Sequence, residues 1–233
     1  MISVCIATYN GEKYIKIQID SILKLLDIND EIIISDDGSN DNTVKIIRSY
    51  SDNRIKLFEK QKFRSPIFNF ENALRKASGD YIVLADQDDI WQNNKIEVIK
   101  EYLNNYDLVL SDANIIDSEG NEIYKSFYEI NGSKQGLIKN IIKNSYLGCA
   151  MAFNRKILNK ALPFPKDIPM HDWWLGLIGE IYGKIYFIDD KLISYRRHEN
   201  NVSPTGEKSI YSLKQKIVFR LKIINNLIWR YVK

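Results

Sequence analysis

Residues 80–91 read DYIVLADQDDIW, and this stretch decides the fold. The apolar run from Tyr81 to Ala85 is typical of a strand that is buried on both faces of a sheet. Three carboxylates, those of Asp86, Asp88 and Asp89, follow the run directly. Carboxylates this close repel one another unless positive charge lies between them. The stretch therefore predicts a buried strand that ends in a cation-binding loop, with a solvated acidic turn as the alternative.

Similar strands alternate with helices on both sides of this stretch. We expect strands at Ile2–Thr8, Glu31–Ser35, Arg54–Glu59, Asp80–Ala85 and Asp107–Ser111, and helices at Glu12–Leu26, Asn42–Tyr50, Ile67–Lys76 and Lys95–Leu103. This alternation with short links predicts an α/β fold with parallel pairing and right-handed crossovers. Ligands bind such sheets beyond the carboxyl ends of the strands. Those ends carry Thr8-Tyr9-Asn10, Asp36-Asp37 and Asp86–Asp89, which are polar or acidic.

The alternation stops in the second half of the chain. There we expect a hairpin over Asn121–Asn131, a strand over Ser145–Phe153, a helix over Asp172–Tyr182, and a second hairpin made by Lys184–Ile188 and Lys191–Tyr195. These elements predict a smaller mixed sheet beside the mostly parallel one.

The last 25 residues, Ser209 to Lys233, predict a basic amphipathic helix. Its apolar stripe is formed by Ile210, Leu213, Ile217, Leu221, Ile224, Ile228 and Tyr231, with Phe219 and Ile223 on the opposite side. One interpretation places one face on the body and the other on a partner subunit. The other is a membrane-surface contact, because Lys214, Lys216, Arg220, Lys222, Arg230 and Lys233 suit anionic lipid.

Composition excludes several classes of protein. The chain has 233 residues and a net charge of +3, so charge alone gives no case for nucleic-acid binding. Its cysteines, Cys5 and Cys149, and its histidines, His171 and His198, are too few for a disulfide scaffold, an iron–sulfur cluster or a zinc finger. Any metal must therefore be held mainly by carboxylates, as Mg²⁺ and Mn²⁺ are. We expect both cysteines in the core.

No signal peptide or membrane-spanning stretch is recognised, which predicts a cytoplasmic protein.

Three further motifs carry candidate chemistry. In Asp36-Asp37-Gly38-Ser39 a carboxylate can accept a hydrogen bond from a pyrimidine N3–H; the alternative is a turn that caps the next helix. In His171-Asp172-Trp173-Trp174 the aspartate is a candidate general base and the indoles are candidate sugar platforms; the alternative is a capping Asp with core tryptophans. Tyr195-Arg196-Arg197-His198 can stabilise a departing diphosphate, or form a basic surface patch.

Together these motifs resemble those of family 2 glycosyltransferases with the GT-A fold, over residues 1–205. The resemblance is carried by Thr8-Tyr9-Asn10 with Glu12, by Asp36-Asp37-Gly38-Ser39 and by Asp86-Gln87-Asp88. The longer form Asp86–Trp91, together with Leu147–Asn154, His171–Trp174 and Tyr195–His198, resembles the rhamnosyltransferase-like branch. The resemblance implies a nucleotide-sugar half at residues 1–112, an acceptor half at 113–205 and a helical tail at 206–233.

The resemblance also implies roles for single residues. The nucleotide is expected at Thr8, Tyr9, Asn10, Glu12, Asp36, Asp37 and Asp86, and Mn²⁺ or Mg²⁺ at Asp88 with Asp86 and His198. The diphosphate is expected at Arg196 and Arg197, and the acceptor at Trp173, Trp174 and Gly148. Asp172 is the expected base; His171 beside it either orients Asp172, touches the acceptor or packs. The family's usual Arg-Asn pair is replaced by Phe70-Glu71, and Arg64 or Arg75 is the candidate substitute.

The implied activity is inverting transfer of a sugar from a UDP- or dTDP-sugar to a hydroxyl of a surface polysaccharide or other glycan, carried on a lipid or a protein. One alternative is a non-catalytic nucleotide-sugar-binding or scaffold protein on the same fold. A nucleotidylyltransferase needs a Gly-rich, Arg-containing loop after the first strand, which Thr8–Glu12 does not supply. A dehydrogenase needs Gly-x-Gly-x-x-Gly there, and this motif is absent.

Overall fold

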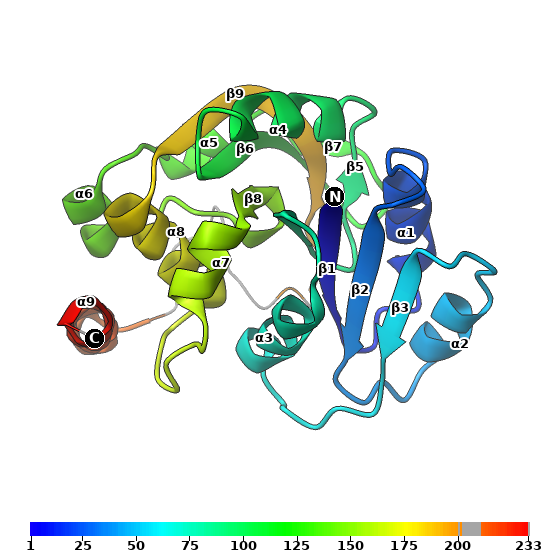
Figure 1. Ribbon diagram of the computed structural model, residues 1–233, viewed down its shortest axis with the longest axis horizontal. Helices are drawn as coiled ribbons and strands as arrows, with labels where there is room; N and C mark the ends of the chain where they lie inside the picture. The colour runs from blue at the N-terminus through cyan, green and yellow to red at the C-terminus, as the bar shows by residue number, and fades with distance from the viewer. Residues whose placement is uncertain (200, 202–210, 233) are drawn as a thin grey trace.

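One mixed β-sheet runs through the molecule in the computed structural model, which describes residues 1–199, 201 and 211–232. Its strand order within these residues is β3-β2-β1-β4-β8-β6-β9-β5, and β7 pairs with β6. The strands are β1 (Ile2–Thr8), β2 (Glu31–Asp36), β3 (Ile55–Phe58), β4 (Tyr81–Ala85), β5 (Ile90–Trp91), β6 (Leu108–Ile116), β7 (Glu122–Tyr124), β8 (Met151–Asn154) and β9 (Ile185–Arg196) (Figure 1).

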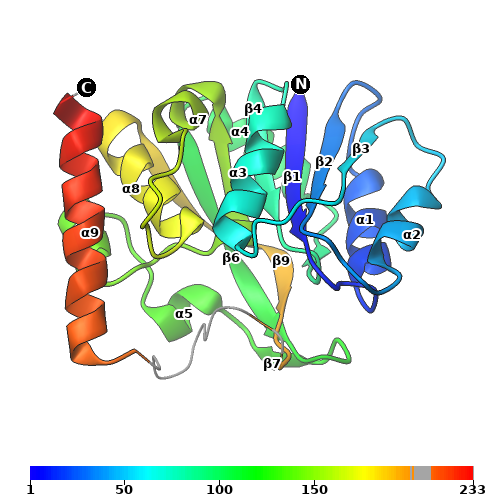
Figure 2. The ribbon, with the colours of Figure 1, turned by 90° about the horizontal axis from the view of Figure 1, so that it is seen from below.

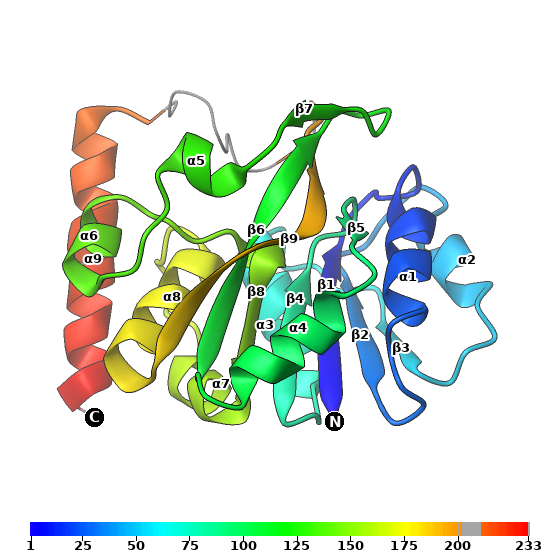
Figure 3. The same ribbon diagram turned by 90° about the horizontal axis from the view of Figure 1, so that it is seen from above.

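Helices cover both faces of the sheet. They are α1 (Ile15–Leu23), α2 (Thr43–Arg48), α3 (Pro66–Lys76), α4 (Lys95–Leu103), α5 (Phe127–Asn131), α6 (Leu137–Ile142), α7 (Arg155–Ala161), α8 (His171–Tyr182) and α9 (Leu213–Val232). Helices α3 and α7 lie on the near side in Figure 2, and α1 and α4 on the near side in Figure 3, which looks from the opposite direction. Because both faces are covered, the central strands are almost continuously apolar and buried.

The parallel half of the sheet has the arrangement that the sequence predicts. Strand β1 pairs in parallel with β2 and with β4, and β2 pairs in parallel with β3. The register places Thr8 beside Asp36 at the carboxyl ends of β1 and β2. The polar loops that follow these strands therefore meet at one edge of the sheet, and the expected α/β fold class is confirmed.

The mixed half continues the same sheet. Strand β8 pairs antiparallel with β4 and β6, and β6 pairs in parallel with β9. The expected strand over Ser145–Phe153 is shorter: a 3₁₀ turn, Gly148–Ala150, precedes β8 and contains Cys149. The expected hairpin at Asn121–Asn131 is present in part, because β7 pairs antiparallel with β6 and is followed by α5.

The second expected hairpin is wrong. Lys184–Ile188 and Lys191–Tyr195 belong to one strand, β9, which pairs along almost the whole of β6. The register places Ser111 beside Ile188 and Asp112 beside Lys191, so Asp189 and Asp190 are extra residues of a bulge. A turn at this point would have left half of the long strand β6 without this partner, and the bulge avoids that loss while turning two carboxylates outward.

The tail forms a helix, as expected, and it packs against the body by its smaller apolar face. Ile223 and Leu227 of α9 are buried. The predicted start at Ser209 lies outside the described residues. Helix α9 contacts α6, and its Asn226 amide donates to Asp167 in the link between α7 and α8. Among the described residues, no helix combines the length and the apolar character that crossing a bilayer requires.

Candidate active site

The loop that follows β2 at the carboxyl edge of the sheet is built around Asp36. This buried carboxylate accepts hydrogen bonds from the backbone N–H groups of Gly38 and Ser39, at 3.1 and 2.9 Å, and from the hydroxyls of Ser39 and Thr8, at 2.5 and 3.0 Å. Gly38 has φ +81°, a conformation that favours glycine. Asp36 and Thr8 therefore shape the turn from inside, and the expected nucleotide contact falls on their neighbours.

Asp37 holds a second segment against this turn. Its two carboxylate oxygens accept hydrogen bonds from the backbone N–H groups of Phe63 and Ser65, at 2.6 and 3.1 Å. Each oxygen keeps a further lone pair. The Asp37 side chain is only partly buried, so it is the carboxylate of this loop that can reach a ligand.

Asn10 and Glu12 connect the loop after β1 to the loop after β2. The Asn10 side-chain oxygen accepts from the Asn40 N–H at 3.0 Å, and Glu12 accepts from the backbone and side chain of Asn42 at 2.9 and 2.8 Å. Asn10 itself has φ +48°, which asparagine tolerates better than most residues. Both residues were expected at the nucleotide, and the structure shows them supporting the loop.

Tyr9 presents its ring to solvent while its backbone is held. The Tyr9 N–H donates to the Gln87 side-chain oxygen at 3.0 Å, and the Gln87 amide donates back to the Tyr9 carbonyl at 3.1 Å. A Cβ on Gly11 would lie 2.3 Å from the same Gln87 oxygen, so only glycine permits this pair. Tyr9, which is 56% exposed, is thereby placed beside the loop Asp86–Asp89, which we call the acidic loop.

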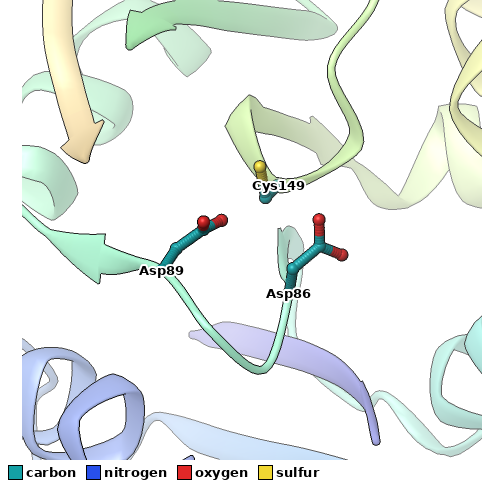
Figure 4. A group of neighbouring side chains, drawn as sticks. All are labelled: Asp86, Asp89 and Cys149. Atoms are coloured by element: carbon teal, nitrogen blue, oxygen red, sulfur yellow. The ribbon is translucent and has the colours of Figure 1, made fainter. Parts of the chain in front are cut away.

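The acidic loop concentrates buried negative charge. Ligand atoms of Asp86, Asp89 and Cys149 all lie within 4.8 Å of one another (Figure 4). Burial and the neighbouring carboxylates raise the pKa of Asp89 to about 7 and the pKa of Asp86 well above its usual range. The Asp89 Oδ2 atom has no hydrogen-bond partner in the described part of the chain. Burial also raises the pKa of the Cys149 thiol above its usual range.

His198 returns to this loop from the end of β9. Its Nε2 atom lies 2.7 Å from Asp88 Oδ2, and its ring stacks on Tyr14 at a centroid distance of 5.1 Å. Residues 88 and 198 are far apart in the sequence, so their contact depends on the pairing of β9 with β5 and β6. The structure thus brings together two of the three expected metal ligands.

Arg196 is used differently from what the sequence predicts. Its guanidinium donates to the carbonyls of Asp88 at 2.8 Å and of Asp117 and Ser118 at 3.0 and 3.2 Å, and its backbone N–H donates to Asp89 Oδ1 at 2.9 Å. The residue is buried and lies over the Tyr14 ring. In place of the expected diphosphate contact, Arg196 holds the acidic loop in position.

We expect Arg196→Lys to destabilise the protein by about 1–3 kcal/mol, because buried carbonyls lose their donors and lysine has no planar fork. Thermal unfolding should register this as a fall in Tm of roughly 2–4 °C for each kcal/mol. Arg48→Lys is the matched control, since Arg48 is exposed and pairs with Glu59 at the surface. Weaker donor binding with an unchanged Tm would show instead that Arg196 contacts the diphosphate.

Asp172 lies in the first turn of α8, across from the acidic loop. It is buried, its Oδ1 atom accepts from the Trp173 N–H at 2.6 Å, and burial raises its pKa to about 6. Its charge contributes to raising the pKa of Asp86, which places the two carboxylates within electrostatic reach. A Cβ on Gly148 would lie 3.5 Å from the Asp172 Cβ and 3.0 Å from His171 Nε2, so glycine lets this turn approach both side chains closely.

His171 is a buried, neutral ring. Burial lowers its pKa to about 3, and its ring stacks on Phe70 at 4.2 Å. Neither ring nitrogen has a hydrogen-bond partner within the described residues. Of the three roles left open by the sequence, packing is the one that the structure displays. Its packing partner is Phe70, which stands where the resemblance implies an arginine, and Glu71 pairs with Arg75 at 2.6 Å.

Trp173 and Trp174 belong to the core. They are 7% and 0% exposed, and their indole N–H groups donate to the carbonyls of Asn140 at 2.6 Å and Ala161 at 2.9 Å. Neither ring offers a face to a sugar, so the structure corrects the predicted acceptor platform in favour of the alternative interpretation.

Sequence reasoning missed Lys95 and the role of Tyr14. Lys95 is fully buried, its Nζ atom lies 3.5 Å from the Cys149 carbonyl, and burial lowers its pKa to about 8. It faces the charge of Asp89, and Tyr14 contacts both Arg196 and His198. Lys95 begins α4 and Tyr14 directly precedes α1, and the residue pattern predicts an ordinary helix face at both positions, so no signal in the sequence marks them.

Cavity size does not point to this site. A hollow of about 540 Å³ lies at the amino edge of the sheet, lined by residues that include Met1, Asp30 and Tyr81. There Lys100 pairs with Asp27 at 3.0 Å, and Asp30 accepts hydrogen bonds from the backbone N–H groups of Ile2 and Asp27. The carboxyl edge is distinguished by the buried Asp89 Oδ2 atom, which has no hydrogen-bond partner within the described residues.

A sheet of this topology, with acidic and polar loops gathered at the carboxyl ends of its parallel strands, places the protein in the class of open α/β proteins, which bind their ligands at that edge. Comparison of the sequence with known protein families identifies one family. The chain belongs to glycosyl transferase family 2, whose model matches residues 3–162.

Two curated relatives cover most of the chain. A glucosyltransferase of Escherichia coli, WfgD, named for transfer from UDP-Glc to α-D-GlcNAc-diphosphoundecaprenol, is 32% identical over 76% of this chain and 68% of its own length. A dTDP-rhamnosyl transferase of Shigella flexneri, RfbG, is 31% identical over 96% of this chain and 80% of its own. The expected resemblance to the rhamnosyltransferase-like branch is thereby confirmed.

A solved structure shows the same fold. The complex of TarS 1–349 from S. aureus with UDP-GlcNAc superposes with a TM-score of 0.74 at 18% identity, over 95% of this chain. This chain spans 65% of that structure. The GT-A-like fold is confirmed, and sugar transfer is the activity that the family supports.

Proposed function

We propose that the protein is an inverting, metal-dependent glycosyltransferase that uses a UDP- or dTDP-sugar. The observation that carries the proposal is the placement of Asp172. This buried carboxylate, whose pKa burial raises to about 6, packs against Gly148, and the next residue, Cys149, lies against Asp86 and Asp89 of the acidic loop. Residues 1–112 hold the donor and residues 113–205 the acceptor in this proposal.

The donor nucleotide lies at the loops after β1 and β2. Asp37 accepts the N3–H of uracil or thymine through the lone pairs that Phe63 and Ser65 leave free. The exposed Tyr9 ring stacks near the base, and Asp86 reaches the ribose. Asp36, Thr8, Asn10 and Glu12 support these contacts by holding the loops. Since uracil and thymine share the N3–H edge, both nucleotides fit.

The acidic loop has the donor set for a hard divalent ion. Asp88, Asp86 and His198 would hold Mn²⁺ or Mg²⁺, which fits the raised pKa values and the orphaned oxygen of Asp89, because these report uncompensated negative charge. Such an ion acts as a Lewis acid for the negative charge on a leaving diphosphate. Arg197 follows Arg196 into the same loop and is the candidate that remains for the diphosphate.

Asp172 accepts the proton of the acceptor hydroxyl. A carboxylate with a pKa near 6 is ionised at neutral pH and still basic enough to take that proton as the oxygen attacks. Attack from the α8 side, opposite the acidic loop where the diphosphate leaves, inverts the sugar carbon. His171 keeps the site apolar beside the base, and Gly148 leaves space for the acceptor.

The acceptor is a growing surface polysaccharide on a lipid carrier, with a glycan on a protein as the other possibility. Similarity to WfgD and RfbG supports the first, since one is named for a lipid-diphosphate acceptor and the other for rhamnosyl transfer. A cytoplasmic protein that uses a lipid-linked acceptor must reach the inner face of the membrane.

A panel of nucleotide sugars tests the proposal. With Mn²⁺ or Mg²⁺ present, we expect UDP- or dTDP-sugars to raise the Tm and to release nucleoside diphosphate slowly by hydrolysis. GDP- and ADP-sugars are the controls, because purines lack the pyrimidine N3–H edge that Asp37 recognises. Binding without any hydrolysis or transfer would favour a non-catalytic nucleotide-sugar-binding protein, and absence of pyrimidine binding would refute the donor assignment.

A further inference from the structure

Helix α9 leaves its larger apolar face uncovered. Leu213, Ile217, Leu221 and Ile228 are 75%, 49%, 60% and 58% exposed, and their spacings of four, four and seven residues place them in one stripe. The helix runs along the outside of the molecule for its whole length (Figure 2). At 1.5 Å per residue, its 20 residues make a stripe of about 30 Å.

Helix α6 extends this stripe. Arg220 of α9 donates to the Ile142 carbonyl at the end of α6, at 2.9 Å from its Nε. Asn226 and Arg230 face the other way, toward Asp167 and the Leu162 carbonyl. Successive residues of an α-helix are turned by about 100°, which places Ile217 and Leu221 next to Arg220 on the side away from Asn226. Because Arg220 contacts α6, the apolar stripe lies beside α6.

Two exposed side chains of α6 add to the same side. Ile138 and Ile142 are 76% and 60% exposed, and α6 lies beside α9 in Figures 1 and 3. We call Ile138, Ile142, Leu213, Ile217, Leu221 and Ile228 the α6–α9 surface. An exposed apolar patch of this kind marks an interaction site.

The two chain segments that carry the α6–α9 surface are basic. Residues 131–147 and 211–232 contain no Asp or Glu, and they carry Lys134, Lys139, Lys143, Lys214, Lys216, Arg220, Lys222 and Arg230. The rest of the chain has 25 basic and 30 acidic residues, so the basic character is local. Desolvation and the charges of Lys134 and Lys143 lower the pKa of Lys139, so these three lysines lie close enough to repel one another.

We propose that the α6–α9 surface docks the protein on an anionic lipid membrane, with α9 lying in the plane of the interface. Its apolar stripe enters the boundary between headgroups and acyl chains, and the lysines beside it meet the anionic headgroups. A second copy of the chain fits less well, because two such helices would bring only like charges together. The inference stands on this surface and is independent of the proposed function.

The residue that follows the candidate base contacts both helices of the α6–α9 surface. Trp173, which follows Asp172, donates its indole N–H to the Asn140 carbonyl of α6, and Arg220 of α9 lies over its ring at 6.0 Å. Docking through α6 and α9 therefore places the α8 side of the site next to the lipid. A sugar acceptor held on a lipid would approach Asp172 from this side.

Vesicle flotation tests the proposal. We expect the full chain to float with vesicles of phosphatidylcholine and phosphatidylglycerol, and to bind pure phosphatidylcholine at least tenfold more weakly. Ile217→Glu/Leu221→Glu should lower binding to the anionic vesicles at least tenfold. Ile28→Glu is the matched control, because Ile28 is 84% exposed in the link between α1 and β2. All variants should keep the wild-type Tm and the wild-type rate of donor hydrolysis.

Each other outcome decides against the proposal. Equal binding to both vesicle types, or no binding to either, would overturn it. A dimer in analytical ultracentrifugation that Ile217→Glu/Leu221→Glu dissociates would assign the surface to a second copy of the chain. As an independent variant, Lys214→Gln/Lys222→Gln should weaken anionic binding while leaving the apolar stripe intact, and unchanged binding would remove the electrostatic part of the argument.

Discussion

Asp172→Asn should lower the rate of sugar transfer by about 10²–10⁴-fold, the range that a general base contributes. Asparagine keeps the size of the side chain and its acceptor oxygen for the Trp173 N–H, but it cannot take a proton. Affinity for UDP or dTDP should remain within twofold, because Asp172 lies across from the donor loops. Steady-state transfer and calorimetric nucleotide binding measure the two effects separately.

The pH dependence provides a second measurement of the same role. Burial raises the pKa of Asp172 to about 6, so the carboxylate loses its basic form as the pH falls through 6. Wild-type kcat/KM should therefore decrease below about pH 6, and the residual activity of Asp172→Asn should lack that step. Asp190→Asn, at the exposed bulge of β9, is the matched control. Near-wild-type turnover of Asp172→Asn would remove Asp172 from the mechanism.

Asp88→Ala should abolish the effect of the divalent ion on donor binding. In Mn²⁺ the variant should bind UDP or dTDP at least tenfold more weakly than the wild type, which corresponds to about 1.4 kcal/mol. Its affinity should equal that of the wild type in EDTA, since the loss is the loss of the ion. Calorimetry of both proteins in Mn²⁺ and in EDTA measures this difference.

The design separates a metal ligand from a structural residue. Asp190→Ala removes a carboxylate at the surface and should leave metal-dependent binding unchanged. Asp88→Ala also removes the partner of His198, so its Tm must be measured together with its affinity. A variant that keeps the wild-type Tm and the full response to Mn²⁺ would exclude Asp88 as a ligand.

The parallel half of the fold could be predicted because its signals are local. Each strand from β1 to β4 is an apolar run bounded by polar turns, and α8 begins at the expected His171-Asp172 pair. The mixed half depends on pairing between distant strands. The single strand β9 could not be distinguished from a hairpin, because Asp189-Asp190 has the composition of a turn and only the length of β6 decides between them.

The candidate site shows the same division. The sequence alone identifies Asp86, Asp88 and Asp172, since carboxylates after apolar strands or at a helix start are conspicuous. It cannot show which polar groups are already engaged. Arg196 has a basic side chain in a basic motif, yet its donors are taken by carbonyls of Asp88, Asp117 and Ser118, which come near only after folding. The buried Lys95 was missed for the same reason.

The two cysteines have a practical consequence for experiments on this protein. Cys5 and Cys149 are both buried, and burial raises the pKa of each thiol above its usual range. The thiolate is the form that attacks thiol reagents, so neither native cysteine will react readily at neutral pH in the folded state. Leu221→Cys would then accept a polarity-sensitive dye without removal of any native residue. The wild-type chain is in this sense already prepared for site-specific labelling.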